Sequence, residues 1–217
     1  MYRLIVFDLD GTLCPIGKGM RSEDIALLRR LEESGARIAI CSGKPTYYLC
    51  GFMRQIGLKA PVLVGENGAV IQFGVDLPPR QFYILPYSKA AKRSIRLLRD
   101  AIDQELPDMW YQPNETMLTP FPRDEAEFAA LDACVDRMRP QLEDVIIYRH
   151  CDCYDITPNG LTKQSGLVRL GQLLDIPAEE TVCVGDGIND YPMFEYAGLA
   201  LGVNVAQADK GDIIYKH

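Results

Sequence analysis

The sequence contains no apolar run long enough to cross a membrane. Its longest apolar stretches, such as Leu4 to Phe7 and Pro61 to Val64, have the length of a strand, far short of the roughly 20 residues that a spanning helix needs. Residues 1–3 lead directly into the first of these stretches, without the apolar segment and small-residue cleavage site of a secretory signal. We therefore expect no membrane partner.

The sequence has fewer basic residues than acidic ones, which disfavours binding to nucleic acid. Lys and Arg total 23 against 30 Asp and Glu, so the net charge is −7, and the summed field of the protein repels a polyanion. We expect no nucleic-acid partner. An anionic small substrate is compatible with this charge only where local groups hold it.

The cysteines do not form a disulfide framework or a zinc site. They number seven, an odd count, and two of them, Cys41 and Cys183, end apolar strand-like runs where they would pack as small hydrophobic side chains. The pair Cys151 and Cys153 has no second Cys or His pair at zinc-site spacing. A reducing, cytoplasmic location is the expectation. With 217 residues and 47% apolar composition, the chain is long enough to bury a core without such cross-links.

Strand-like and helix-like segments alternate in the first third of the chain. Compact apolar runs at 3–7, 37–41 and 61–64 are typical of buried parallel strands. Between them, helices are predicted from Ser22 to the stop signal at Gly35, and from Pro45 to Gly57. Three such repeats predict an α/β fold with a Rossmann-like parallel sheet and helices on both faces.

The middle of the chain departs from this order. Strands are predicted at 70–73, 115–119 and 145–148, with helices at 88–102 and 124–138, and prolines mark irregular connections. The first pattern resumes with a helix at 163–174, a strand at 181–184, a short helix after Asp190 and a strand at 199–203. We therefore predict a core of residues 1–70 and 157–217, with residues 71–156 inserted as a separate α+β domain.

Polar side chains follow several predicted core strands at their carboxyl ends. They are Asp8 and Asp10 after the first strand, Ser42 after the second, and Asp186 with Asp190 after a late one. Ligands of open α/β sheets bind at this edge. Carboxylates that converge there repel one another unless a cation is present, and Mg²⁺ prefers oxygen ligands of this kind. Taken singly, Asp10-Gly11, Ser42-Gly43 and Asp186-Gly187 are equally typical of ordinary turns.

The order of these residues resembles the four motifs of the haloacid dehalogenase superfamily of phosphatases. The segments that carry the resemblance are Asp8-Leu9-Asp10-Gly11-Thr12-Leu13, Ser42, Lys163 at the start of a helix, and Gly185-Asp186-Gly187-Ile188-Asn189-Asp190. Further segments are similar to the Cof-type branch, in which an α/β cap lies between the second and third motifs: Glu66-Asn67-Gly68-Ala69, Asp155-Ile156-Thr157-Pro158, and Pro192-Met193.

This resemblance implies a role for each motif residue. Asp8 is the expected nucleophile that forms an aspartyl-phosphate, and Asp10 the expected general acid and base. Mg²⁺ is the implied cofactor, held by Asp8, the backbone carbonyl of Asp10, Asp186 and Asp190. Ser42, Gly43 and Lys163 are expected to hold phosphoryl oxygens. Further substrate contacts are expected from Lys44, Asn67 and Asn189.

The implied substrate is a small phosphorylated metabolite, such as a sugar phosphate or a phosphoglycolate-like compound. Two alternatives stay open at this point. A phosphotransferase or phosphomutase of the same superfamily would use the same aspartyl-phosphate. A non-enzymatic phospho-aspartate switch would also combine acidic residues, Mg²⁺, a hydroxyl and a lysine, although such a receiver domain would have no insertion of this size.

Overall fold

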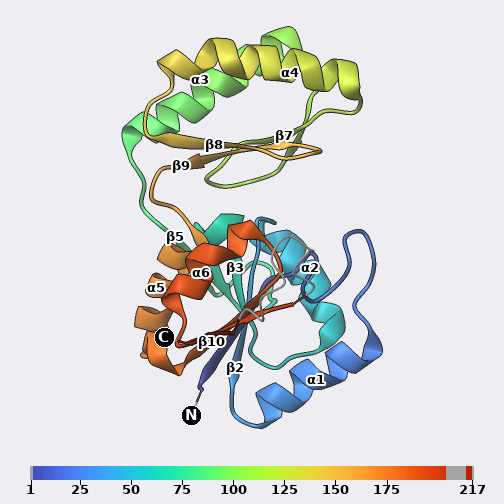
Figure 1. Cartoon of the computed structure of the whole chain (residues 1–217), viewed down its shortest axis with the longest axis vertical. Coiled ribbons are helices and arrows are strands. Elements are labelled where there is room, and N and C mark those ends of the chain that lie inside the picture. The colour runs from blue at the N-terminus through green and yellow to red at the C-terminus, as the bar shows by residue number, and fades with distance from the viewer. Residues whose placement is uncertain (1, 204–213, 217) are drawn as a thin grey trace. The chain divides into compact units, whose positions relative to one another are not determined.

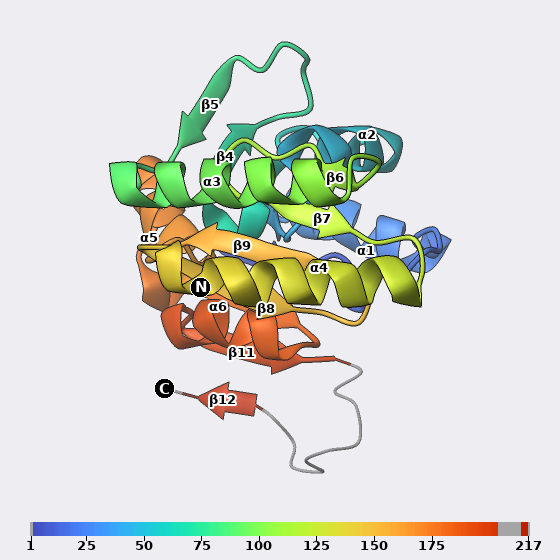
Figure 2. The same ribbon diagram turned by 90° about the horizontal axis from the view of Figure 1, so that it is seen from above.

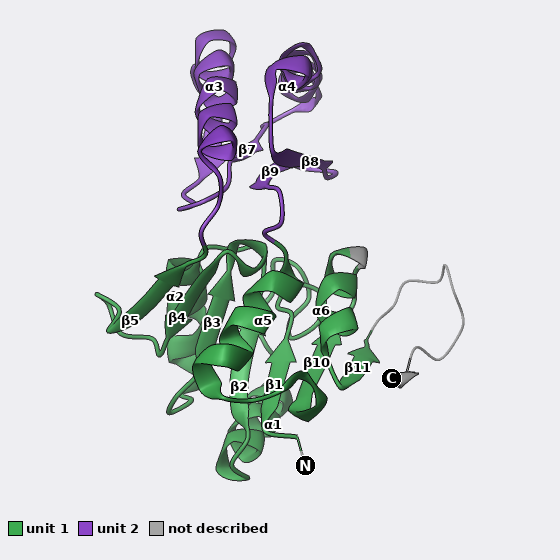
Figure 3. Ribbon diagram, turned by 90° about the vertical axis from the view of Figure 1, so that its left-hand side faces the viewer, with its two compact units in different colours: residues 1–85, 162–217 green, residues 86–161 purple. Residues whose placement is uncertain are grey.

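The protein is described from a computed structural model that covers residues 2–203 and 214–216 (Figure 1). It consists of two compact units, residues 1–85 with 162–217 and residues 86–161 (Figure 3). An eight-stranded sheet in the order β12-β11-β10-β1-β2-β3-β4-β5 organises unit 1. Its strands are β1 (Leu4–Phe7), β2 (Arg37–Cys41), β3 (Val62–Gly65), β4 (Val70–Phe73), β5 (Gln81–Ile84), β10 (Thr181–Gly185), β11 (Leu199–Gly202) and β12 (Ile214–Lys216).

The five central strands β11, β10, β1, β2 and β3 run parallel, and β12, β4 and β5 are added antiparallel at the edges. Four helices pack on the two faces of the sheet, with α5 and α6 on one side and α1 and α2 on the other (Figure 3). They are α1 (Ser22–Glu33), α2 (Thr46–Ile56), α5 (Lys163–Leu174) and α6 (Tyr191–Tyr196). The predicted Rossmann-like α/β fold is confirmed.

Short-range signals in the sequence fix the ends of these helices. Gly57 ends α2 in a left-handed conformation with φ 73°, which costs glycine little. Thr162 caps α5: its side chain accepts a hydrogen bond from the backbone N–H of Ser165, while the Ser165 side chain bonds back to Thr162. The cap places Lys163 in the first turn of α5. The described residues also form short 3₁₀ segments: η1 (Glu66–Gly68), η2 (Arg139–Gln141), η3 (Ala178–Glu180) and η4 (Ile188–Asp190).

Unit 2 places two helices on one side of four short strands (Figure 1). The helices are α3 (Lys89–Glu105), capped by Ser88, and α4 (Glu125–Met138), capped by Asp124, and Figure 2 shows them side by side. The strands are β6 (Trp110–Gln112), β7 (Thr119–Phe121), β8 (Val145–Arg149) and β9 (Tyr154–Pro158). Both strand pairs, β6–β7 and β8–β9, are antiparallel.

The inserted unit spans residues 86–161 in the structure, whereas the sequence predicted residues 71–156. Residues 70–84 form β4 and β5, which extend the sheet of unit 1 by antiparallel pairing with β3 and with each other. Contacts group residues 157–161 with unit 2 instead, where Thr157 and Pro158 complete the ladder between β8 and β9. The strand predicted at 115–119 is displaced: residues 113–117 connect the two strands, Leu118 forms a bridge with Ile156, and β7 begins at Thr119. Within the described residues, no helix is both long and apolar enough to cross a bilayer.

Candidate active site

Asp8 lies at the carboxyl end of β1, near the middle of the unit 1 sheet. Its backbone N–H donates to the carbonyl of Val184 at the end of neighbouring β10, over 2.9 Å. The side chain is buried, with 5% of the residue exposed. Since β1 lies between β10 and β2, this carboxylate lies at the edge of the sheet where three parallel strands end.

Lys163 neutralises part of this acidic centre. The lysine is 1% exposed, and its ammonium donates to Oδ1 of Asp8 and to Oδ1 of Asp190, each over 2.6 Å. A charged amine is stable at such depth only when it is paired and hydrogen-bonded. Lys163 therefore joins the first and last acidic motifs of the chain into one buried cluster.

Burial and charge shift the ionisation of this cluster in opposite directions. Burial, reinforced by the neighbouring carboxylate of Asp190, raises the pKa of Asp8 to about 6, although Lys163 opposes the shift. Burial alone would lower the pKa of Lys163, but the carboxylates of Asp8 and Asp190 outweigh it and raise that pKa above its usual value. Lys163 is therefore a permanent cation at neutral pH.

The loop after β10 holds two further carboxylates in fixed positions. Oδ2 of Asp190 accepts hydrogen bonds from the backbone N–H groups of Asp186 and Gly187, over 2.9 and 3.0 Å. The hydroxyl of Thr12 donates to Oδ1 of Asp186 over 2.6 Å. Gly11, at φ +94°, leaves room for Asp186, since a Cβ on Gly11 would lie 2.2 Å from Oδ2 of Asp186. Sequence reasoning did not find the role of Thr12.

The carboxylates of Asp8, Asp186 and Asp190 fit a divalent cation. Each offers an oxygen, and these oxygens all lie within 4.8 Å of one another. An all-oxygen donor set with excess negative charge suits Mg²⁺. The convergence predicted from the sequence for these three residues is present. The side chain of Asp10 is not a member of this group; its carboxylate lies 3.8 Å from the ammonium of Lys44 instead.

Four of the residues expected to contact phosphate or substrate follow β2 and β3 directly: Ser42, Gly43, Lys44 and Asn67. Ser42 is buried, and its Oγ accepts from the backbone N–H of Lys44 over 3.2 Å. The backbone N–H of Asn67 donates to the carbonyl of Ser42 over 3.0 Å. A Cβ on Gly43 would lie 3.3 Å from the amide oxygen of Asn67, so Gly43 and Asn67 are neighbours. Asn189, in contrast, is exposed in η4.

The 3₁₀ turn η1 lies between the loop after β2 and the first turn of α5, the helix that begins at Lys163. Glu66 and Asn67 have φ values of 53° and 52° and Gly68 has φ 99°, a run of left-handed residues that costs energy outside glycine. A Cβ on Gly68 would lie 2.1 Å from the carbonyl oxygen of Thr162, and one on Gly166 would lie 2.5 Å from Cα of Gly68. The glycine pair therefore lets η1 lie directly against the first turn of α5. Sequence reasoning identified the turn but missed this contact.

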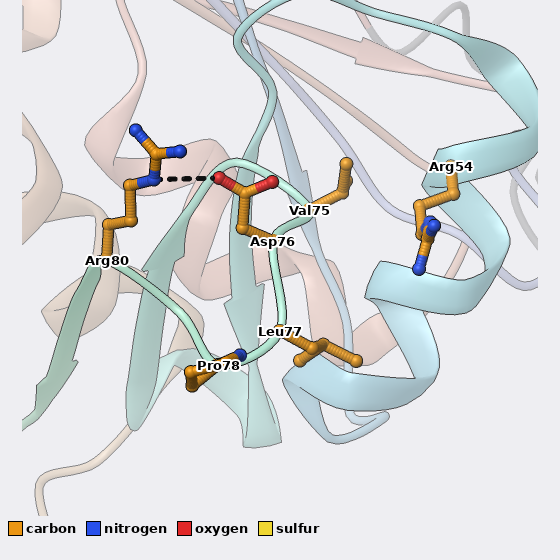
Figure 4. A pocket seen from close by; sticks show the side chains of 6 residues that line it. All are labelled: Arg54, Val75, Asp76, Leu77, Pro78 and Arg80. Atoms are coloured by element: carbon orange, nitrogen blue, oxygen red, sulfur yellow. Dashed lines mark ion pairs between the residues drawn. The ribbon is translucent and has the colours of Figure 1, made fainter.

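A pocket of about 530 Å³ lies elsewhere in unit 1. It is lined by Arg54 of α2 and by residues of the connection between β4 and β5 (Figure 4). In it, Nε of Arg80 lies 3.1 Å from Oδ2 of Asp76. None of the acidic motif residues lines it, so this pocket is separate from the carboxylate cluster.

The match to a family profile shows the family of the chain, and named relatives cover most of its length. The profile of the haloacid dehalogenase-like hydrolases matches residues 5–106 and 83–211. The chain is 26% identical over 215 residues to a phosphoglycolate phosphatase of Methanococcoides burtonii, with 97% of this chain and 86% of that protein covered. It is 25% identical over 227 residues to an HMP-PP phosphatase of Yersinia pseudotuberculosis, with 93% and 83% covered.

Solved structures share the fold of the chain. A haloacid dehalogenase-like hydrolase from Bacteroides thetaiotaomicron superposes with a TM-score of 0.77 at 18% identity, covering 96% of this chain and 90% of that one. A structure titled as a HAD subclass IIB sugar phosphatase superposes with a TM-score of 0.68 at 20% identity, covering 94% and 88%. The family match and the shared fold together establish that the chain belongs to the haloacid dehalogenase-like hydrolases.

Proposed function

We propose that the protein is a Mg²⁺-dependent phosphomonoester hydrolase that acts on a small phosphorylated metabolite through an aspartyl-phosphate on Asp8. The observation that carries the proposal is the buried cluster of Asp8, Lys163 and Asp190, with Asp186 within reach of the same cation. Among the relatives, phosphoglycolate and HMP-PP are substrates by name, and a sugar phosphate or a phosphoglycolate-like compound is the proposed class here.

In the first step, a carboxylate oxygen of Asp8 attacks phosphorus, and the bond from phosphorus to the ester oxygen breaks. Asp10 gives its proton to the departing alkoxide. The carboxyl of Asp10 follows the same strand end and lies beside Lys44. Lys163 is held against Asp8 before the substrate arrives, so its charge is in place to offset the oxygens of the incoming phosphoryl group.

In the second step, Asp10, now a carboxylate, takes a proton from water. The water oxygen attacks phosphorus, and the bond between phosphorus and the Asp8 carboxylate breaks to release inorganic phosphate. Ser42 and the backbone N–H of Gly43 are proposed to hold the phosphoryl oxygens in both steps. Lys44, Asn67 and Asn189 are proposed to contact the substrate at the rim of the site.

Asp8, Asp186 and Asp190, with the backbone carbonyl of Asp10, are the groups proposed to hold the metal. When bound, Mg²⁺ supplies positive charge that offsets the repulsion between these carboxylates and the phosphate ester. Unit 2 is proposed to act as the cap that covers the leaving group and excludes water during transfer.

The test is release of inorganic phosphate from a panel of phosphorylated metabolites with Mg²⁺, run beside Asp8→Asn. The amide is nearly isosteric with the carboxylate but is not a nucleophile, so activity should fall by at least about 10²- to 10⁴-fold. Mass spectrometry of quenched enzyme should place the phosphoryl adduct on Asp8. An active Asp8→Asn protein, or an adduct on another residue, would refute the assignment. Transfer of phosphate to a sugar acceptor in place of water would identify a phosphotransferase.

A further inference from the structure

Another cavity of unit 1 lies at the opposite edge of the sheet from the carboxylate cluster. It measures about 730 Å³, a size that holds small organic ligands, and all of its lining residues belong to unit 1. Arg37, which lines it, begins β2, whereas Ser42 directly follows the end of β2. Five residues of strand rise roughly 16 Å. The cavity is therefore separate from the candidate active site.

Cationic side chains dominate the lining of this cavity. Arg37, Lys59 and Arg80 line it, and none of its described lining residues is acidic. The guanidinium of Arg37 is oriented by a hydrogen bond from Nη1 to the carbonyl oxygen of Ala60 over 3.3 Å. This bond uses one of the five N–H donors of an arginine, so Arg37 can still bind an anion through two parallel hydrogen bonds.

The charges of Lys59 and Arg80 are accessible to a ligand. Both oxygens of Glu32 accept backbone N–H groups, from Lys59 over 2.8 Å and from Ala60 over 2.9 Å, so the backbone holds that carboxylate and not the exposed side chain of Lys59. Arg80 pairs with Asp76, but the two side chains are 87% and 62% exposed. An ion pair as exposed as this contributes little stability, so an incoming anion can displace the carboxylate of Asp76.

The local charge contrasts with that of the whole chain. The net charge of the protein is −7, yet the charged side chains that line this cavity are all cations. The pocket of Figure 4 shares Arg80 with it and adds Arg54. Cations gathered in a cleft attract anions even on a protein that is acidic overall. A phosphate group fits such a cluster, because it accepts charge-assisted hydrogen bonds from Lys and paired ones from Arg.

Aromatic side chains lie beside these cations in the lining. Phe73 of β4 is paired with Gln81 of β5, and Tyr83 lies two residues further along β5, so all three side chains point to the same face of the sheet. The rings of Phe73 and Tyr83 meet edge to face, with centroids 6.1 Å apart, and both residues are partly exposed. Leu173 and Leu174, at the end of α5, add apolar surface. A planar ring can stack on a surface of this kind.

We propose that this cavity binds a mononucleotide at a second, non-catalytic site. The phosphates contact Arg37, Lys59 and Arg80, and the base lies against Phe73 and Tyr83. The aromatic lining favours a nucleotide over inorganic phosphate, which would leave that surface unused. The net charge of −7 favours a small anion over a nucleic-acid strand, whose further phosphates would meet an acidic protein. The inference is independent of the proposed function, since no residue of the carboxylate cluster lines the cavity.

Calorimetric titration of the full chain with ADP tests the proposal. In metal chelator, ADP should bind saturably. Lys59→Gln and Arg80→Gln should each raise the Kd by about 10-fold, because a hydrogen bond between charged partners is lost. Arg96→Gln removes an equal charge from the exposed surface of α3 and is the matched control. Its Kd should equal that of the unaltered protein.

Two further measurements test the role of the base and the location of the site. Tyr83→Leu should raise the Kd for ADP by about 10-fold, since base–aromatic stacking is lost, and should leave the Kd for pyrophosphate unchanged. Photolabelling with 8-azido-ADP, followed by peptide mapping, should modify the segment 73–83. No saturable binding, a Kd that Lys59→Gln and Arg80→Gln leave unchanged, equal affinity for pyrophosphate and ADP, or label found only outside the cavity lining would overturn the inference.

Discussion

Replacing Lys163 by methionine should expose how strongly the acidic cluster depends on one cation. At an effective dielectric constant of about 20, unit charges at the observed 2.6 Å attract by roughly 6 kcal/mol for each of the two contacts. Desolvation offsets much of this, and removing one partner of a buried ion pair costs about 3–5 kcal/mol because a buried charge stays behind. In metal chelator, Lys163→Met should therefore lower the free energy of unfolding by about that amount, or Tm by roughly 6–20 °C.

The stability lost in the Lys163→Met variant should be larger at high pH than at low pH. Burial already raises the pKa of Asp8 to about 6, above its ordinary value of 3.8, and without Lys163 that pKa rises further. The folded variant then binds a proton on Asp8 more tightly than the unfolded chain does, so its stability falls as pH rises from about 4 through the raised pKa. Urea unfolding at pH 5 and pH 8 should show the larger deficit at pH 8.

A control variant and a double variant test whether the loss comes from an uncompensated buried charge. Lys44→Met removes a lysine that is one-third exposed and 3.8 Å from Asp10, and should change stability by less than about 1 kcal/mol. Asp8→Asn added to Lys163→Met should recover part of the loss, because it removes the uncompensated charge. Equal deficits at both pH values, or no recovery in the double variant, would refute this account of the cluster.

Three other outcomes are expected. A metal chelator should abolish phosphate release and added Mg²⁺ should restore it, because oxygens of three carboxylates lie close enough together to bind one cation. Full activity in chelator would contradict this. Gly166→Ala puts a Cβ 2.5 Å from Gly68 and displaces Lys163, so kcat should fall at least about 10-fold, whereas Gly51→Ala, in open space on α2, should leave kcat unchanged. Joining residue 85 to residue 162 by a short linker should leave a folded core with weak, unselective hydrolysis; retained selectivity would show that unit 2 is not the specificity cap.

Local patterns in the sequence were sufficient to locate the acidic centre. Strands of a parallel sheet end at one edge, so Asp8, Asp186 and Asp190 could be expected to meet once each was placed after an apolar run. The helix that begins at Lys163 was also predicted, and the structure shows that Thr162 and Ser165 form its cap. These features depend on residues within a few positions of one another, which is the range that sequence patterns describe well.

The tertiary structure decided which strands pair at the edge of the sheet and which buried side chains are in hydrogen-bond contact. Residues 70–84 were predicted to begin the inserted domain because the βα order ends there, yet they pair antiparallel with β3. A short apolar run does not specify which strand it joins, since that choice depends on hydrogen bonds to a partner elsewhere in the chain. Likewise, the buried contact of Lys163 with both Asp8 and Asp190 joins residues 155 and 27 positions apart. Such a contact forms only when the packing of α5 against η1 has brought the three side chains together, because no local pattern records the space that Gly68 and Gly166 leave for it.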